Sequence, residues 1–204
     1  MGAARLTLAL AIAAAFAACG GSGTAPSTTT TTPAPLRADI SDPVGDAAAD
    51  ARVPVPPDLV HATMTVASQS LMLVVTFAPG TFARQTTKVS ALLDTDSNGT
   101  TGIRQPDGVG ADYSIDIDAN TGSAAILKAN PASCAARITC FDGAGSASAT
   151  VLADGVQVTV PLSAIGGGDG HMIFQLNAYA NVAPLTPVIF DFLPDTNIAP
   201  ARVQ

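Results

Sequence analysis

Hydrophobic and polar residues alternate with a period of two along most of the chain beyond residue 37. Apolar side chains occupy every second position of 60–66 and of 71–77, and His or Thr fills the gaps in the first segment. Successive side chains of a β-strand point to opposite faces of the sheet, so this alternation indicates half-buried strands. The pattern predicts strands over residues 60–66, 71–77, 88–94, 111–118, 123–129, 136–141, 147–153, 156–160, 171–179 and 188–192.

Turn-forming pairs separate these segments. Pro79-Gly80, Asn98-Gly99 and Asp154-Gly155 each stand between two predicted strands, and such pairs favour tight turns. Residues 161–165, which precede a run of three glycines, predict a short helical turn. Short strands at this spacing are typical of sandwiches and jelly rolls. We therefore expect an all-β fold, an antiparallel, jelly-roll-like β-sandwich of about eight to ten strands.

The segment 111–118 gives the clearest half-buried strand and also the first chemical signal. Its apolar side chains point one way, and a row of polar side chains points the other way: Asp112, Ser114, Asp116 and Asp118. Like charges on one strand face repel each other. We expect this face to be well solvated or to have a cation nearby.

Charge and composition exclude several functions. The 204 residues leave room for one domain. The 16 acidic residues against 9 basic ones give a net charge of −7, so we expect no binding to nucleic acid and no electrostatic attraction to anionic lipids. Every acidic residue is Asp, which favours turns over helix interiors.

The N-terminal residues are typical of an export signal. Arg5 precedes an apolar run from Leu6 to Ala18, which is shorter than the roughly 20 residues that span a bilayer. The residues Phe16-Ala17-Ala18-Cys19-Gly20 resemble the lipobox of bacterial lipoproteins, although Phe16 replaces the usual Leu. The resemblance implies a signal peptide over 1–18, lipid modification of Cys19, and anchoring to the bacterial cell envelope on its periplasmic or surface side. The alternative is an ordinary signal peptide.

A flexible tether follows. Residues 19–36 contain no charge and include five consecutive threonines, Thr28 to Thr32. A segment of this kind has too little apolar surface to form a core. We expect it to hold a globular domain of residues 37–204 away from the membrane.

Two cysteines remain for the domain. Cys134 and Cys140 are separated by five residues, in a chain that we expect to be exported to an oxidising compartment. A disulfide between them is the favoured interpretation. Zinc would require further ligands of the CxxC type, which the sequence lacks.

The most informative stretch is an acidic loop after the predicted strand 88–94. Asp94, Asp96, Asn98 and Gly99 form a DxDxNG pattern, the front half of a loop whose alternate oxygens converge on calcium. The predicted ligands are Asp94, Asp96, the Asn98 side chain, the Thr100 carbonyl and Asp112, with Asp107 as the next candidate carboxylate. Gln105 replaces the twelfth-position Glu of an EF-hand. The alternative is a metal-free, Asx-rich turn.

Several short motifs resemble one group of domains. They are Asp42-Pro43-Val44-Gly45-Asp46, Pro57-Asp58-Leu59-Val60, LDTDSNGTTG at 93–102 with GADY at 110–113, VTVPLSAIG at 158–166 and DFLPD at 191–195. They look like secreted bacterial β-sandwiches of the DOMON and family nine carbohydrate-binding module superfamily. The resemblance implies a jelly-roll fold, structural calcium and a binding role.

The family's own ligands do not transfer cleanly. Sugar-binding members use Trp, which this chain lacks, and haem-binding members use Met and His axial ligands. The resemblance also suggests that five aspartates near the two ends of the domain meet, as turn caps or as a second cation site: Asp42, Asp46, Asp58, Asp191 and Asp195. We favour the caps.

No catalytic motif stands out. The chain has neither a GxSxG nor an HExxH sequence and contains two histidines. We therefore expect a calcium-stabilised, non-enzymatic binding or interaction module at the cell envelope, with a glycan or a protein as its partner. The alternative is a carbohydrate-binding or hydrolytic accessory domain.

Overall fold

The computed structural model describes residues 33–106, 108–134, 140–166, 168–182, 186–196 and 198–204. Residues 34–204 form one compact unit. The predicted signal peptide, Cys19 and most of the predicted tether lie outside the described residues. Among the described residues, no helix is long and apolar enough to cross a membrane.

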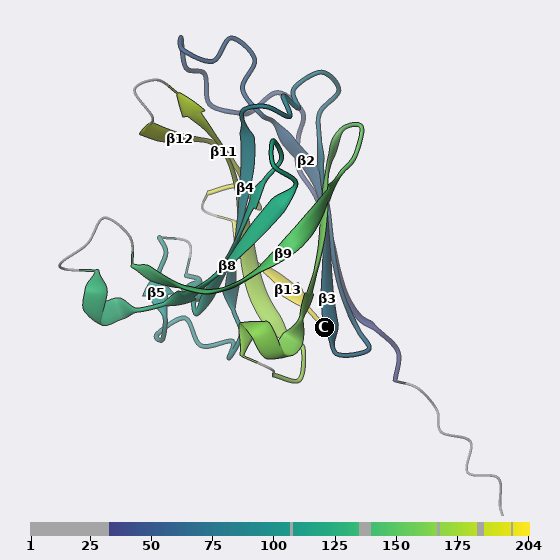
Figure 1. Cartoon of the computed structure of the whole chain (residues 1–204), viewed down its shortest axis with the longest axis vertical. Helices are drawn as coiled ribbons and strands as arrows, with labels where there is room; N and C mark the ends of the chain where they lie inside the picture. The colour runs from purple at the N-terminus through teal and green to yellow at the C-terminus, as the bar shows by residue number, and fades with distance from the viewer. Residues whose placement is uncertain (1–32, 107, 135–139, 167, 183–185, 197) are drawn as a thin grey trace, which may run out of the picture. The chain divides into compact units, whose positions relative to one another are not determined.

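The described chain is all-β, as predicted (Figure 1). Its strands are β1 Leu36–Ser41, β2 Leu59–Ala67, β3 Ser70–Phe77, β4 Thr87–Asp94, β5 Ile103–Arg104, β6 Gly110–Ala111, β7 Tyr113–Asp118, β8 Ser123–Ala129, β9 Phe141–Val151, β10 Gly155–Pro161, β11 Met172–Val182, β12 Thr186–Leu193 and β13 Ala201–Val203. Two short 3₁₀ turns, η1 Pro131–Ser133 and η2 Leu162–Ile165, complete the elements. The second of these is the predicted helical turn.

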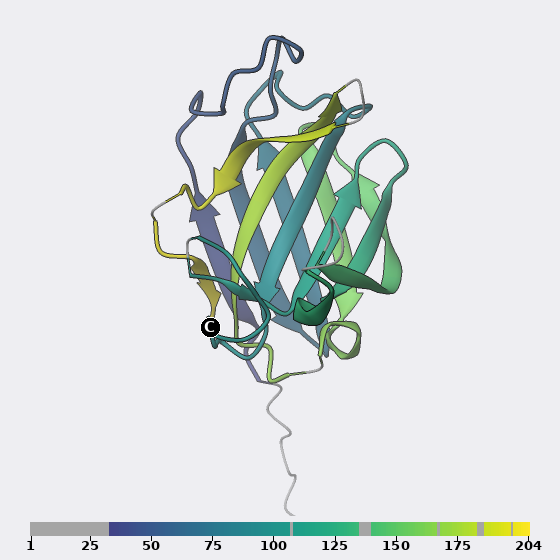
Figure 2. The ribbon, with the colours of Figure 1, turned by 90° about the vertical axis from the view of Figure 1, so that its left-hand side faces the viewer.

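One antiparallel sheet folds over to make two layers. The strand order is β1-β2-β3-β10-β9-β8-β7-β4-β11-β12, with β13 beside β11. The long strand β9 joins the layers, because its first part pairs with β8 and its last three residues pair with β10. At the other edge, the Arg37 amide donates to the Gln204 carbonyl at 3.2 Å. Figure 2 looks onto β4, β11 and β12, with β1 to β3 behind them.

The core lies between the two layers. The predicted alternation places Met64, Leu73 and Val158 on the inner face of one layer and Ile115 and Phe174 on that of the other, and all five are at most 1% exposed. Burying a side chain of this size stabilises a fold by roughly 1.5–3 kcal/mol. The period-two pattern therefore determines both the strands and the face that each strand buries.

The polar face of the predicted strand 111–118 has direct partners on neighbouring strands. Lys88 on β4 contacts Asp118 at 2.7 Å, and the Ser90 hydroxyl donates to Asp116 at 2.7 Å. Burial tends to raise the pKa of Asp118. The hydrogen bond and the charge of Lys88 outweigh burial, and the pKa of Asp118 lies below its usual range. Cross-strand contacts thus give Asp118 a positive partner and Asp116 a hydrogen-bond donor.

Several boundaries differ from the prediction. β1 begins at Leu36, one residue inside the predicted tether, because Leu36 pairs with Val66 of β2. The predicted strand 111–118 is interrupted at Asp112 between β6 and β7. β9 starts at Phe141 and continues through two glycines, which the sequence pattern treated as a break. Residues 136–139 of the predicted strand 136–141 lie outside the described residues.

The predicted disulfide is present. Cys134 and Cys140 are bonded, and their Cα atoms lie 4.4 Å apart. The bond joins the end of η1 to the residue that precedes β9, where the Asn130 amide also donates to the Cys140 carbonyl at 2.7 Å. It closes a short loop and removes conformational freedom from the unfolded chain.

We expect replacement of both cysteines by serine to lower the free energy of unfolding by about 2 kcal/mol, the loop-entropy value for a closure this short. Denaturant unfolding of the oxidised parent and of the double variant measures the difference. An unchanged free energy of unfolding would show that the unfolded chain already holds this loop closed.

Candidate functional site

The acidic loop begins at a buried carboxylate. Asp94 is the last residue of β4, where it pairs with Ile173 of β11, and its side chain is fully buried. Oδ1 accepts a hydrogen bond from the Asn98 amide at 2.9 Å. Oδ2 is also buried and has no hydrogen-bond partner among the described residues. An unpaired buried oxygen of this kind is costly unless a ligand satisfies it.

The environment of Asp94 disfavours a negative charge without a counter-ion. Burial raises the pKa of Asp94 above its usual value, and the neighbouring Asp96 and Asp112 raise it further. The backbone amides of Asn98 and Gly110 lower the pKa of Asp94 and oppose this effect only in part. A cation between these carboxylates would reverse it.

The structure brings three of the predicted ligands together. Asp94, Asp96 and Asp112 each offer a carboxylate oxygen, and these oxygens lie within 4.8 Å of one another. Asp96 is exposed and accepts from the Thr101 hydroxyl at 3.0 Å. Asp112 arrives from the interruption between β6 and β7, where its Oδ2 accepts from the amide and hydroxyl of Thr95 at 3.0 and 3.1 Å.

The other predicted ligands differ in their roles. The Asn98 side-chain oxygen accepts from the Thr100 amide at 3.2 Å and from its hydroxyl at 2.7 Å. Asn98 and Thr100 therefore form an Asx turn with each other at the exposed rim of the loop. Asp107 lies outside the described residues. An Asx turn is thus present beside the carboxylate cluster, as both interpretations of the loop allow.

Glycines let the loop pack closely on itself. The DxDxNG pattern predicts a sharp turn at Gly99, but the positive φ angles of the loop lie at Ser97, at 55°, and at Gly102, at 61°. The role of Gly99 is instead close approach, since a Cβ atom there would stand 2.5 Å from the Gly108 carbonyl oxygen. A Cβ on Gly110 would stand 2.6 Å from the Thr101 carbonyl oxygen and 2.7 Å from that of Asn98. Backbone carbonyls therefore crowd the base of the loop.

A small apolar cluster supports the loop from below. The pair β5–β6 forms a short hairpin, closed by a hydrogen bond from the Gln105 amide to the Val109 carbonyl at 2.9 Å. Beneath it, Val109 and Ala111 pack with Leu92 and Ile173 as a second buried cluster. This packing fixes the chain between Asp96 and Asp112. The Asp112 carboxylate therefore lies close to that of Asp94.

The donor set determines the chemistry. The site offers carboxylate oxygens, and neither a His nor a Cys belongs to the described cluster. Oxygen donors in an irregular loop suit calcium, which accepts variable geometry, better than magnesium, which keeps a strict octahedron and most of its water. The unpaired Oδ2 of Asp94 fits such an ion. The arrangement of oxygen donors can bind a hard cation.

A second feature lies on the outer face of the β4–β7–β11–β12 layer. A hollow of about 300 Å³ is lined by Ser90, Asp116, Asn177, Tyr179 and Ile189. Asn177 is 8% exposed, and its Oδ1 has no hydrogen-bond partner among the described residues. Burial, together with the charges of Asp116 and Asp118, raises the pKa of Tyr179, so its hydroxyl stays protonated. Asn177 was not among the predicted site residues, because its place in the hollow depends on which strands are neighbours.

Comparison with known proteins adds no assignment. No protein-family model matches the chain, and no curated protein matches it.

Proposed function

We propose that this protein is a calcium-stabilised, non-enzymatic binding module held at the bacterial cell envelope by a lipid on Cys19. The observation that carries the metal part is Asp94, whose buried Oδ2 has no hydrogen-bond partner among the described residues and whose carboxylate lies with those of Asp96 and Asp112. Calcium would offset two of the three negative charges and satisfy the buried oxygen. The Asn98 side chain and the Thr100 carbonyl would supply further oxygens.

The proposed calcium connects parts of the chain that are distant in sequence. Asp94 ends β4, Asp96 lies in the loop, and Asp112 precedes β7. An ion that binds the folded arrangement and not the unfolded chain raises the free energy of unfolding, by about 2.7 kcal/mol when its concentration is a hundred times the Kd. Calcium in the external medium would therefore stabilise the module where it works.

Anchoring is proposed from the N-terminal sequence. Arg5, the apolar run to Ala18 and the lipobox-like residues before Cys19 form the signal. A single acyl chain gives marginal membrane binding, and two or more give stable anchoring. The residues after Cys19 would then act as the tether that separates the sandwich from the membrane.

A second candidate function, carbohydrate binding, is favoured by the hollow on the outer sheet face. Its carboxylate, its unpaired buried amide oxygen and its tyrosine ring are groups that pair with sugar hydroxyls and pack against a sugar ring. Its volume of about 300 Å³ lies at the small end of ligand sites. A single sugar unit of an envelope glycan matches that size and polarity.

Replacement of Asp94 and Asp96 by alanine should abolish the effect of calcium on stability. We expect calcium to raise the melting temperature of the parent chain relative to chelator, and to leave the melting temperature of this loop variant unchanged, because two of the three charged ligands are gone. Thermal melts in calcium, magnesium and chelator measure the effect.

A matched control is the variant Asp39→Asn with Asp50→Asn, which removes the same number of charges from exposed ion pairs. We expect it to keep the calcium shift of the parent. Equal melting temperatures of the parent in calcium and in chelator would rule out the loop as a stabilising metal site.

Lipid modification can be tested directly in a bacterial host. We expect the full chain to incorporate radiolabelled palmitate and to sediment with membranes, and Cys19→Ser to lose both, because the thioether forms on that sulfur. The variant with serine at positions 134 and 140 is the control, and it should label like the parent. Labelling that persists in Cys19→Ser would refute the assignment.

Retention on immobilised envelope polysaccharides tests the carbohydrate candidate. We expect Tyr179→Ala to reduce retention at least tenfold, about 1.4 kcal/mol of binding free energy, because the ring forms one wall of the hollow. Met72→Ala, on the outer face of the other layer, should be retained like the parent. If the parent itself passes unretained over a broad panel of glycans, this candidate function is wrong.

A further inference from the structure

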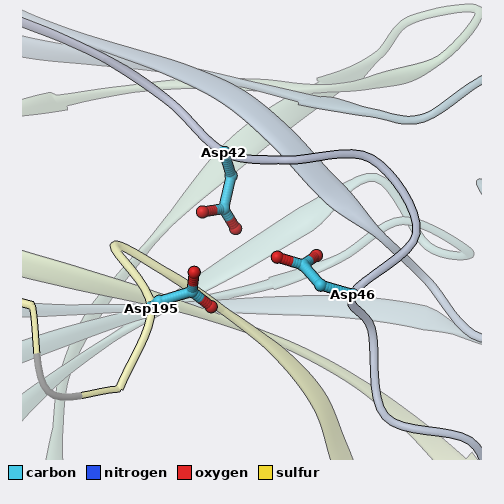
Figure 3. Close-up of side chains that lie close together, drawn as sticks. All are labelled: Asp42, Asp46 and Asp195. Carbon is cyan, nitrogen blue, oxygen red and sulfur yellow. The ribbon is translucent and has the colours of Figure 1, made fainter.

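A second group of carboxylates lies away from the acidic loop. Asp42, Asp46 and Asp195 form one triplet, and Asp46, Asp58 and Asp191 form another; in each triplet, oxygens lie within 4.8 Å of one another. We call the five residues the end cluster. Figure 3 shows the carboxylates of Asp42, Asp46 and Asp195 turned toward a common space. In Figures 1 and 2 the segment 42–58 lies at the end of the sandwich opposite β5.

Two β-bulges build the end cluster. In β2 the register shifts between Leu59 and His61, next to Asp58. In β12 the register shifts around Phe190, so that Phe190 and Asp191 are both buried although they are consecutive. A bulge re-aims a side chain that regular alternation would send to the opposite face. The second bulge therefore turns Asp191 inward.

The two bulges also hold the segment that carries Asp42 and Asp46. The Asp42 amide donates to the carbonyl of Val60, the extra residue of the first bulge, at 3.0 Å. The Ala48 amide donates to the carbonyl of Phe190, the extra residue of the second, at 2.6 Å. These bonds fix the chain on both sides of Asp46. The Asp46 carboxylate therefore faces Asp58 and Asp191, although no described residue donates a hydrogen bond to it.

Some carboxylate oxygens of the end cluster accept hydrogen bonds from backbone amides, as turn caps do. Most of these amides are distant in sequence from the carboxylate. Asp58 Oδ2 accepts from the Gly45 amide at 2.7 Å. Asp191 Oδ2 accepts from the Leu59 amide at 2.6 Å, 132 residues away. Only the bond from the Phe192 amide to Asp191 Oδ1, at 2.8 Å, is local. Capping therefore accounts for part of the oxygen set.

Capping does not account for the rest. Asp58 is 4% exposed, and its Oδ1 is buried with no hydrogen-bond partner among the described residues. Asp42 Oδ2 is likewise buried and has no hydrogen-bond partner among the described residues. A buried carboxylate oxygen without a donor is costly, and here two such oxygens occur in one cluster. Both belong to carboxylates whose neighbours are further carboxylates.

Positive charge is missing from the surroundings as well. None of the ion pairs among the described residues includes a member of the end cluster. Burial, reinforced by the nearby carboxylates, raises the pKa of Asp42 to about 7 and that of Asp191 to about 7. The protein side chains leave the negative charge of this cluster uncompensated.

We infer that the end cluster is a second divalent-cation site, separate from the acidic loop, in which Asp46, Asp58 and Asp191 bind the ion and Asp42 and Asp195 complete the oxygen set. Hard oxygen donors and an irregular arrangement match calcium. The ion would join the 42–58 segment to β2 and β12, which belong to different layers of the sandwich.

Counting bound calcium separates the two sites. The full chain is stripped with chelator and dialysed against radioactive calcium, alongside an end variant, Asp46→Asn with Asp58→Asn, and the loop variant Asp94→Ala with Asp96→Ala. We expect the loop variant to keep calcium at the end cluster, and the end variant to lose it or to bind it at least about tenfold more weakly. The loop ion would remain in the end variant.

The Asn substitutions are chosen to keep the fold intact. Asparagine still offers an oxygen to the Gly45 amide, and it removes repulsion, so we expect the end variant to melt in chelator at or above the temperature of the parent. Should the double change prevent folding, the half-buried Asp195→Asn serves instead, with a smaller loss of affinity. The variant Asp39→Asn with Asp50→Asn should bind calcium like the parent.

Two results would overturn the inference. One is a loop variant that folds and binds no calcium, and the other is an end variant that binds as many ions as the parent with the same affinities. If calcium binds the end cluster and not the loop, the proposed loop site fails while this inference stands. The two claims are therefore tested separately in one experiment.

Discussion

A carboxylate that is buried without a donor or a counter-ion is the constraint on which the two ends of this sandwich depend. Asp94 and Asp58 are each at most 4% exposed, and each keeps one oxygen without a partner among the described residues. Leaving a charge in this condition destabilises the folded state far more than an exposed carboxylate would. A bound cation turns the same arrangement into a favourable one, because it supplies the missing charge and the missing ligand together.

The β-scaffold makes such sites possible at both ends. In the middle of the sheet, the strand register places Lys88 opposite Asp118 and so gives that carboxylate a positive partner. At the ends of strands the chain leaves the ladder, and bulges and tightly packed glycines bring acidic residues from distant segments together. The outer face of the layer formed by β4, β7, β11 and β12 carries the hollow, which has the polar and aromatic groups that a binding surface needs.

The sequence predicted the features that depend on local pattern. Strands such as β3 and β10 were placed within one residue because apolar side chains alternate strictly, and the disulfide followed from two nearby cysteines. β1 and β13 were missed because they are short and their burial comes from pairing with β2 and β11. Asp112 was named because it follows the loop closely. The proximity of Asp58 and Asp191 could not be predicted without the strand order. The inward orientation of Asp191 depends on a β-bulge, which has no signature in the sequence pattern.

The most direct test of this account is a crystal structure of the full chain grown with calcium, with anomalous scattering used to locate the ion. We predict a peak among Asp94, Asp96 and Asp112 and another among Asp46, Asp58 and Asp191, each with oxygens at roughly 2.3–2.6 Å. The unpaired oxygens of Asp94 and Asp58 should be among those ligands. Density that shows these carboxylates bonded to water or to one another, with no anomalous peak at either end, would contradict the claim that cations hold the sandwich together.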